Sequence, residues 1–570
     1  MSPLLSAFAP DAPMFVRVRD GDLQAWSARQ CAGAVEALAA VLPSATHAIQ
    51  CCTDTLELAL GTLAAWRAGQ TVVMPSTRLA ADVERLRLGF ADSYVLDGAA
   101  FADAVRAAAA SRAANASGKD AATTLLAASP PAWPAFALDP AHPAIVLFTS
   151  GTTREPRAQA KTWDALVRGA ETFRRAFPHA VAQPLLAGTV DCHHMFGLEA
   201  NFMASIHCGY PLCTDRPQLP ADLAALLASG ASARFGPLWL VTTPLQLSAF
   251  LRARGVAVEG IERVIVATMP LPQSLAVDVE AAWHTRVDEI YGNTECGVMA
   301  TRRTATQRAF TPAPGVVFQF REGAGASVTR IPGAAVELDD RIVAVAGGDG
   351  AFELLGRRSD MVKVAGKRTT LRALDDHLLD IAGVDDGAFL QQDDDGRVSA
   401  VVVAPAHTPA SLRAELARRV DPAFMPRPLL FAATLPRDPQ GKLPRDTLLR
   451  IAAGLARAAA QRARTITRDR VFPASHPAFA GHFPGHPVVP GAMLLAEVDD
   501  LLESHGYRVR GCDAAKFMAP IGPGELCTIR VDCADPRRVV FDIGVADRAC
   551  VRGVFACESP ASVAAAGEVA

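Results

Sequence analysis

Short apolar runs that end in loops of small and hydroxylated residues recur along the first half of the chain. Three examples are Ala144–Phe148 before TSGTT, Leu238–Val241 before TTP and Val264–Ala267 before TMP, each followed by helix-compatible sequence. Continuous apolar strands are typical of a largely buried sheet, and loops at the carboxyl ends of such strands commonly carry function. The sequence therefore predicts an α/β domain.

Composition narrows the class of protein further. A length of 570 residues predicts several domains, and a 50% hydrophobic content is ample for sizeable cores. The net charge of −3 gives no sign of a nucleic-acid-binding surface. We see neither a signal peptide nor an apolar run long enough for a transmembrane helix. The 12 cysteines include no CxxC pair, which favours buried reduced thiols and a cytoplasmic protein.

Four ordered segments between residues 148 and 445 are the candidates for carrying chemistry. They are Phe148–Thr153 (FTSGTT), Tyr291–Glu295 (YGNTE), Gly356–Lys363 (GRRSDMVK) and Pro436–Arg445 (PRDPQGKLPR). Backbone N–H groups and hydroxyls in a loop such as FTSGTT can cradle phosphate oxygens, although this motif alone is a weak signal. In this order the four segments resemble the adenylate-forming superfamily of acyl-CoA synthetases, aryl acid ligases and nonribosomal adenylation domains. The resemblance covers about Arg17 to Leu449.

The resemblance implies a domain organisation and a set of small-molecule partners. It implies a large AMP-binding domain over residues 1–356 and a small, mobile α+β subdomain over residues 357–455. ATP and Mg²⁺ would serve the reaction, with a coenzyme A thiol or the phosphopantetheine thiol of an acyl carrier protein as acceptor. Within the large domain, an Ala-, Ser- and Pro-rich segment from about Ala107 to Ala135 is expected to be a surface excursion.

The same resemblance implies individual roles. Lys442, in the PxxxxGK motif, would neutralise charge in the transition state of acid activation. Glu295 would hold Mg²⁺, with Thr294 on the phosphates and Tyr291 beside the adenine. The other implied nucleotide-binding residues are Thr149, Ser150, Gly151, Thr152, Thr153 and Arg357, and the implied hinge residues are Ser359 and Asp360.

Two departures from the family pattern concern the nucleotide. No TGD motif is present, and Asp340 in Leu338–Arg341 is the nearest match for the ribose carboxylate, with Asp339 and a simple surface turn as alternatives. In the phosphate loop, Arg154 replaces a glycine and so disfavours a positive φ. Arg157 stands where the family has lysine, and Lys161 is a second candidate for the phosphate role.

The segment Cys192–Gly197 (CHHMFG) resembles the histidine-glycine segment beside the acid substrate in this family. We predict His194 and Gly197 as substrate-binding residues. The alternative for His194 is a core histidine with satisfied hydrogen bonds. A zinc site at the His193–His194 pair is not supported, because no Cys or His partner lies at ligand spacing.

A second signature lies towards the C-terminus. The string Pro477–Gly491, with GHFPGHPVVPG at its end, and the later Phe517–Glu525 resemble the hotdog fold of 3-hydroxyacyl-ACP dehydratases. The resemblance implies an α+β hotdog domain over residues 465–557 with His482 as one catalytic partner. The second partner, a carboxylate on the following helix, falls on Ala496, which cannot exchange a proton. Glu497 is one residue on, rotated by about 100° along a helix, and is either a displaced partner or a solvated side chain.

Together the two resemblances imply an AMP-forming ligase that loads an aryl or fatty acid onto a thiol, with a hotdog domain that acts on or binds 3-hydroxyacyl thioesters. The pairing is similar to ligase and dehydratase proteins of bacterial aryl polyene pathways. A homodimer through the hotdog domain is expected. Two alternatives remain: a thioesterase with a decayed ligase half, and a non-catalytic assembly module.

Overall fold

The computed structural model describes residues 7–19, 22–110, 121–128, 137–149, 157–179, 183–253, 258, 260–321, 325–330, 335–345, 350–357, 360–364, 367–391, 397–438, 441–479 and 486–558. The chain divides into two compact units, residues 1–449 and residues 450–570. Within the described residues, no helix has both the length and the apolar character that crossing a membrane requires.

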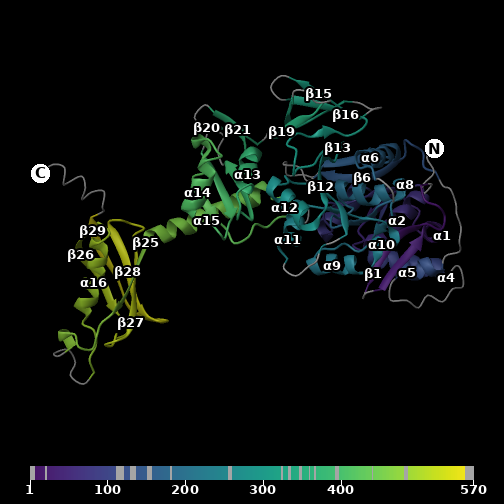
Figure 1. The fold of residues 1–570 in the computed structure, drawn as a ribbon. Coiled ribbons are helices and arrows are strands. Elements are labelled where there is room, and N and C mark those ends of the chain that lie inside the picture. Colours follow the sequence, from purple (N-terminus) through teal and green to yellow (C-terminus); the bar gives the residue numbers. More distant parts are fainter. Residues whose placement is uncertain are drawn as a thin grey trace. The chain divides into compact units, whose positions relative to one another are not determined.

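A nine-stranded sheet forms the centre of the first unit, in the order β14-β13-β12-β11-β10-β8-β9-β1-β2. Of its strands, Figure 1 labels β1, β12 and β13. Its strands are β1 Pro13–Arg19, β2 Asp22–Ser27, β8 Leu185–Gly188, β9 Leu212–Cys213, β10 Leu238–Thr242, β11 Ile261–Val266, β12 Arg286–Asn293, β13 Gly297–Arg302 and β14 Thr311–Pro312. Strands β8, β10, β11 and β12 pair in parallel, and β13 returns antiparallel to β12. Two of the predicted apolar runs therefore form neighbouring central strands, whose carboxyl ends lie on one edge of the sheet.

The third predicted run belongs to a second, five-stranded sheet in the order β5-β3-β4-β6-β7. Its strands are β3 His47–Gln50, β4 Thr71–Val73, β5 Ser93–Leu96, β6 Pro143–Thr149 and β7 Arg157–Thr162. Strand β6 pairs in parallel with β4 and antiparallel with β7, so the phosphate-loop motif begins at the end of a central strand.

Helices pack around these two sheets. They are α1 Ala28–Ala39, α2 Thr55–Arg67, α3 Ala80–Gly89, α4 Gly98–Ala110, α5 Ala121–Ala128, α6 Trp163–Ala176, α7 Met195–Gly197, the π-helix η1 Leu198–Met203, α8 Ala204–Cys208, α9 Pro220–Ala228, α10 Ala231–Phe235, α11 Pro244–Arg252 and α12 Gln273–Trp283. The TTP loop shows how local sequence starts a helix: the Thr243 side chain accepts from Gln246 N, and Pro244 occupies the first turn of α11.

The expectation of a surface excursion between Ala107 and Ala135 is wrong for helix α5. Its residues Ala122, Leu125 and Leu126 are buried in the main hydrophobic core. They recur at helical spacing, so an alanine-rich composition conceals a face that packs inward.

The remainder of the first unit consists of small sheets and the helices beside them. These elements are β15 Val316–Arg321, β16 Gly325–Arg330, β17 Ala335–Glu337, β18 Asp340–Ala344, β19 Phe352–Arg357, β20 Met361–Val364, β21 Lys367–Thr370, α13 Leu371–Leu379, β22 Asp386–Gln391, β23 Val398–Val403, α14 Pro409–Ala417, η3 Pro422–Phe424 and β24 Leu429–Phe431. A separate hydrophobic core, which includes Val362, Leu378 and Phe389, holds the elements from β20 onward together. Helix α15, Arg445–Arg464, follows and leads into the second unit.

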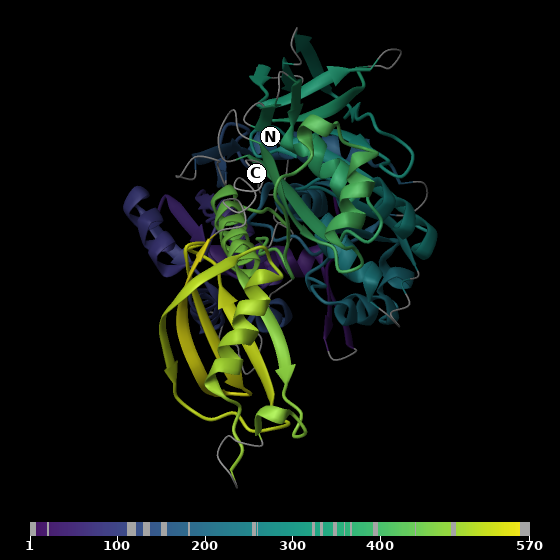
Figure 2. The same cartoon turned by 90° about the vertical axis from the view of Figure 1, so that its left-hand side faces the viewer.

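The second unit is a five-stranded antiparallel sheet in the order β25-β27-β28-β29-β26 with one long helix against it (Figure 2). Its elements are β25 Thr465–Val471, η4 Pro477–Phe479, α16 Gly491–Glu503, β26 Arg508–Phe517, β27 Leu526–Asp532, β28 Arg538–Val545 and β29 Arg548–Glu558. Helix α16 buries Leu494, Val498 and Leu501 in a core shared with Ile529 and Phe541 of the sheet. This helix-on-sheet arrangement is the predicted hotdog architecture.

Candidate active site

The candidate nucleotide site joins strand β12 to strand β18. The Tyr291 hydroxyl donates to Asp340 Oδ2 at 2.8 Å, and the buried Tyr291 ring packs beside Phe310 and Phe352. Asp340 also lies opposite Arg357 in the β18–β19 register. The structure thus brings together three residues that the sequence assigned to nucleotide binding. The alternative carboxylate, Asp339, is exposed.

This geometry separates the two candidates for the ribose carboxylate. We expect Asp340→Ala to raise the KM for ATP by about tenfold or more, because a hydrogen bond to a charged group contributes roughly 1.5–3 kcal/mol. Asp339→Ala is the matched control and should leave that KM unchanged. Steady-state kinetics at saturating acid would check the prediction, and an equal effect of both variants would contradict it.

Thr294 and Glu295 lie in the tight turn that connects β12 to β13. Asn293 Oδ1 accepts from Cys296 N at 2.7 Å and closes the turn. Glu295 is exposed, while its carbonyl oxygen accepts a hydrogen bond from the buried Lys161 ammonium of β7. Lys161 therefore links the five-stranded sheet, which carries the phosphate-loop motif, to the turn that carries the candidate Mg²⁺ ligand.

The phosphate loop itself is described only at its ends. Thr149 is the last residue of β6, and its backbone is paired with that of Arg157 at the start of β7. The predictions for Ser150, Gly151, Thr152, Thr153 and Arg154 lie outside the described residues. The hinge prediction is likewise only partly covered: Asp360 is described, whereas Ser359 lies outside the described residues.

Lys442 is presented by a compact turn. Asp438 anchors it twice: Lys442 N donates to Asp438 Oδ1 at 2.7 Å, and Gly441 N donates to Asp438 O at 2.8 Å. Gly441 has a φ of +81°, and a Cβ there would lie 2.7 Å from the sulfur of Met269. Glycine thus permits both the turn and its close approach to the loop after β11.

His194 lies within the electrostatic reach of Lys442. Burial, followed by the positive charge of Lys442, lowers the pKa of His194 to about 4, and the charge of Asp191 opposes this only in part. His194 caps α7, where its Nδ1 accepts from Phe196 N at 3.2 Å. The imidazole is therefore neutral at pH 7, with its proton on Nε2, which is a hydrogen-bond donor suited to an acid substrate.

The neighbouring His193 has a different environment. Its Nδ1 pairs with Asp191 Oδ1 at 2.6 Å, and its Nε2 with the carbonyl oxygen of Gln50 at 2.9 Å. Arg78 and Arg216 both contact Asp191 at 3.1 Å. Although burial opposes ionisation, the hydrogen bond and charge of His193 hold the pKa of Asp191 well below its usual range. His193 is thus a structural histidine that links the two sheets, and sequence reasoning missed this role.

Two further observations bear on the acid segment. A Cβ on Gly197 would lie 2.3 Å from the carbonyl oxygen of Asp191, so only glycine fits beside that backbone. Among the described residues, no group of three His, Cys, Asp or Glu side chains is placed to hold a metal ion.

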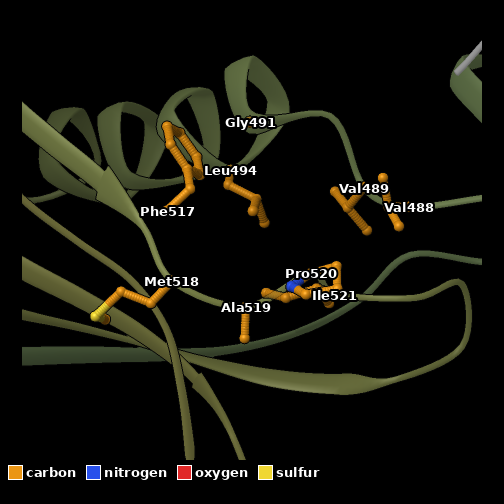
Figure 3. Close-up of a pocket in the computed structure, with 9 residues that line it drawn as sticks. All are labelled: Val488, Val489, Gly491, Leu494, Phe517, Met518, Ala519, Pro520 and Ile521. Atoms are coloured by element: carbon orange, nitrogen blue, oxygen red, sulfur yellow. The ribbon is translucent and has the colours of Figure 1, made fainter. Parts of the chain in front are cut away.

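The hotdog unit contains an apolar cavity of about 450 Å³ between the N-terminal end of α16 and the segment after β26 (Figure 3). Its lining residues are Val488, Val489, Gly491, Leu494, Phe517, Met518, Ala519, Pro520 and Ile521. Ala496 is exposed on α16. Glu497 is only 13% exposed and pairs with Arg470 of β25 at 2.8 Å. His482 lies outside the described residues.

These folds and sites define an AMP-forming acid ligase joined to a dehydratase-like hotdog domain. Residues 6–324 match the family described as AMP-binding enzyme, and the chain belongs to that family. Residues 458–554 match the family described as ApeI dehydratase.

Individual relatives agree with this division. The chain is 27% identical to the sulfoacetate–CoA ligase of Cupriavidus necator over 348 residues, which cover 54% of this chain and 67% of that protein. It is 36% identical to the 3-hydroxyacyl-acyl-carrier-protein dehydratase FabZ of Geotalea uraniireducens over 98 residues, which cover 15% of this chain and 66% of that protein.

Solved structures support the fold. The anthranilate CoA ligase AuaEII in complex with anthranoyl-AMP superimposes with a TM-score of 0.65 at 14% identity, over 79% of this chain and 95% of that one. The ATP-bound MatB of Rhodopseudomonas palustris gives a TM-score of 0.63 at 18% identity, over 78% of this chain and 96% of that one. The predicted α/β multidomain fold is confirmed.

Proposed function

We propose that this chain activates an aryl or fatty acid with ATP and transfers the acyl group to a thiol. The observation that carries the proposal is the turn of Lys442, which lies against Met269 after β11 and brings a positive charge near enough to contribute to the lowered pKa of His194. On the other side of the site, the Tyr291–Asp340 pair offers a contact for the ribose and a wall for the adenine.

The proposed reaction has two steps. A carboxylate oxygen of the acid attacks the α-phosphorus of ATP, the bond to the bridging oxygen breaks, and pyrophosphate leaves with its electron pair. A thiolate sulfur then attacks the acyl carbon, and AMP leaves. Lys442 would stabilise the charge on the α-phosphate oxygens in the first step. The neutral His194 would donate from Nε2 to the acid and orient it.

The site offers one carboxylate to a magnesium ion. Mg²⁺ is usually bound through one or two carboxylates together with water and substrate phosphates, and Glu295 offers one exposed carboxylate on the turn after β12. When bound, the ion would supply charge neutralisation for the phosphate oxygens of ATP. The residues of this chain that would hold it are Glu295 and, beside it, Thr294.

For the acceptor, we propose the phosphopantetheine thiol of an acyl carrier protein, with coenzyme A as the alternative. The FabZ relatives are named for carrier-bound 3-hydroxyacyl groups, and a domain of that type follows the ligase in one chain. The hotdog domain would then bind 3-hydroxyacyl thioesters in its apolar cavity. We place the protein in the cytoplasm, since its 12 cysteines, all within the described ranges, are free thiols.

A direct test is acid-dependent exchange of pyrophosphate into ATP with a panel of aromatic and medium-chain acids. Exchange with at least one acid is expected. The absence of exchange with every acid would overturn the ligase proposal, and ATP-independent release of free acid from thioesters would favour a thioesterase instead. Discharge of the acyl-adenylate onto a carrier protein against coenzyme A would identify the acceptor.

We also propose a homodimer through the hotdog domain. Strand β26 lies at the edge of its sheet with all but one of its residues exposed, including Phe517 at 51%. A long exposed edge strand is a ready template for pairing with another chain.

Size-exclusion chromatography with light scattering tests the dimer. Wild type should have twice the 59.9 kDa chain mass, and Phe517→Glu should approach the chain mass. Leu88→Glu, at the exposed Leu88 in the ligase unit, is the control and should stay dimeric. A monomeric wild type would refute the proposal.

A further inference from the structure

Glu199 is a buried carboxylate to which neither the sequence motifs nor the proposed reaction assigns a role. It lies on the π-helix η1, two residues after Gly197, and only 3% of it is exposed. Burying a carboxylate is costly unless polar partners compensate it. A π-helical turn is rare and frequently marks a functional site. Its contacts therefore show which part of the site it serves.

The carboxylate reaches the turn that carries Thr294 and Glu295. Val298 N donates to Glu199 Oε2 at 2.8 Å, in a hydrogen bond that is buried. Val298 belongs to β13, whose first residue, Gly297, directly follows Cys296 at the end of the turn. Glu199 therefore holds the point at which the chain leaves this turn.

Two glycines make room for this one carboxylate. A Cβ on Gly169 of α6 would lie 2.3 Å from Glu199 Oε1, and a Cβ on Gly297 would lie 2.6 Å from Glu199 Oε2. Gly297 also has a φ of +72°, which disfavours any other residue. Neither Gly169 nor Gly297 could carry a side chain without displacing the carboxylate, which therefore lies closely packed between them.

We propose that Glu199 is a positioning residue of the adenylation reaction. By holding Val298 and Gly297, it fixes the turn that presents Thr294 and Glu295 to the MgATP phosphates. Its helix continues directly from His194 and Gly197, so the same segment ties the acid side of the site to the phosphate side. This inference rests on the proposed ligase function and extends it to a residue that acts through the turn without touching substrate.

The first test compares Glu199→Ala with Glu199→Gln in the full-length protein. Calorimetric titration with MgATP should show affinity about tenfold weaker in Glu199→Ala, since the buried Val298 N–H loses its acceptor. Glu199→Gln keeps an acceptor oxygen of the same reach and should stay within about threefold of wild type. In pyrophosphate exchange, the KM for ATP should rise in Glu199→Ala while the KM for the acid stays nearly constant. A defect that is equal for ATP and acid would indicate a merely structural residue and overturn the proposal.

A second variant decides the matter if Glu199→Ala does not fold. Gly169→Ala places a methyl group against Glu199 Oε1 in a helix where alanine is favoured, and it should reproduce the loss of MgATP affinity. The matched control is Gly454→Ala in α15, where the added Cβ meets no atom within 4 Å apart from its chain neighbours and the backbone of its own helix. Unchanged MgATP affinity in Gly169→Ala would refute the role of Glu199. Wild-type protein that binds MgATP but exchanges no pyrophosphate with any acid would refute only the ligase proposal. The MgATP affinities of the variants would still test whether Glu199 positions the turn.

Discussion

Replacing Lys442 by alanine is expected to lower acid-dependent ATP–pyrophosphate exchange by about a hundred- to a thousandfold, the usual cost of losing one preorganised charge or donor at a developing transition state. The structure gives two reasons for an effect of this size. Asp438 fixes the turn that carries Lys442, and Gly441 allows this turn to lie against Met269. The positive charge of Lys442 also adds to the effect of burial in lowering the pKa of His194.

Two controls separate the charge from the fold. Lys367→Ala removes another lysine from the same part of the chain, one that is exposed and pairs with Asp421, and should leave exchange unchanged. Lys442→Arg keeps the charge but replaces a compact ammonium with a planar fork, so only partial activity is expected. Thiol transfer from a pre-formed acyl-adenylate should be affected little, because the thiolate attacks the acyl carbon and phosphorus does not become pentacovalent in that step. Full exchange in Lys442→Ala would contradict the assignment.

The histidine pair shows why part of this site could not be predicted from the sequence. Both His193 and His194 stand in one motif, and nothing in the string distinguishes a structural histidine from a substrate-facing one. The distinction comes from partners distant in sequence, since Gln50 binds His193, whereas Lys442 acts on His194. Local motifs name the residue types at a site, but contacts across the fold determine their charges and tautomers.

Glu199 and helix α5 illustrate the same limit at the level of packing. The apolar runs that form β6, β10 and β11 could be predicted because continuous hydrophobicity is a local property. The role of the Glu199 carboxylate depends on its contacts with Gly169 and Val298. Both residues are distant from Glu199 in the sequence, so this role could not be predicted from a local motif. Composition likewise predicted α5 to lie at the surface, whereas the helical spacing of Ala122, Leu125 and Leu126 puts one face of this helix in the core. The Tyr291–Asp340 contact was predicted in part: the motifs identified both residues as nucleotide-binding candidates but did not predict the hydrogen bond between them.

The hotdog unit leads to the second large prediction: wild-type protein should leave a 3-hydroxyacyl carrier-protein thioester unchanged, and Ala496→Glu should convert it to the enoyl thioester. Dehydration removes the α-proton, breaks the bond from the β-carbon to oxygen and releases water, so it needs both a base and an acid. In the resemblance His482 supplies one partner, and the other position holds alanine. Glu497 pairs with Arg470, so we expect that its carboxylate does not replace the missing group.

The size of the expected rate gain in Ala496→Glu, and its controls, follow from the missing carboxylate at position 496. A positioned acid or base contributes about a hundred- to ten-thousandfold, so Ala496→Glu should exceed Ala496→Gln by about a hundredfold or more. Glutamine has the same shape as glutamate, but its side-chain amide cannot act as an acid or a base near neutral pH. Enoyl product would be measured by mass spectrometry of the carrier protein. Adding His482→Ala to Ala496→Glu should abolish the gain, and wild-type turnover equal to that of Ala496→Glu would refute the idea of a degenerate site.

The position of Ala496 connects this activity to the oligomeric state. The residue is exposed on α16, whereas Leu494, two residues earlier, is buried and lines the apolar cavity. Two residues along a helix correspond to a rotation of about 200°, so a carboxylate at position 496 points away from the apolar cavity that Leu494 of the same chain lines. Such a carboxylate would take part in dehydration if a second subunit supplied the substrate cavity on its side of the helix. We therefore expect Ala515→Glu, on the exposed edge strand β26 but outside the cavity lining, to separate the dimer and to abolish the dehydratase activity gained in Ala496→Glu, while pyrophosphate exchange in the ligase unit persists. Retention of dehydration in a monomer would show that each hotdog domain closes its site alone.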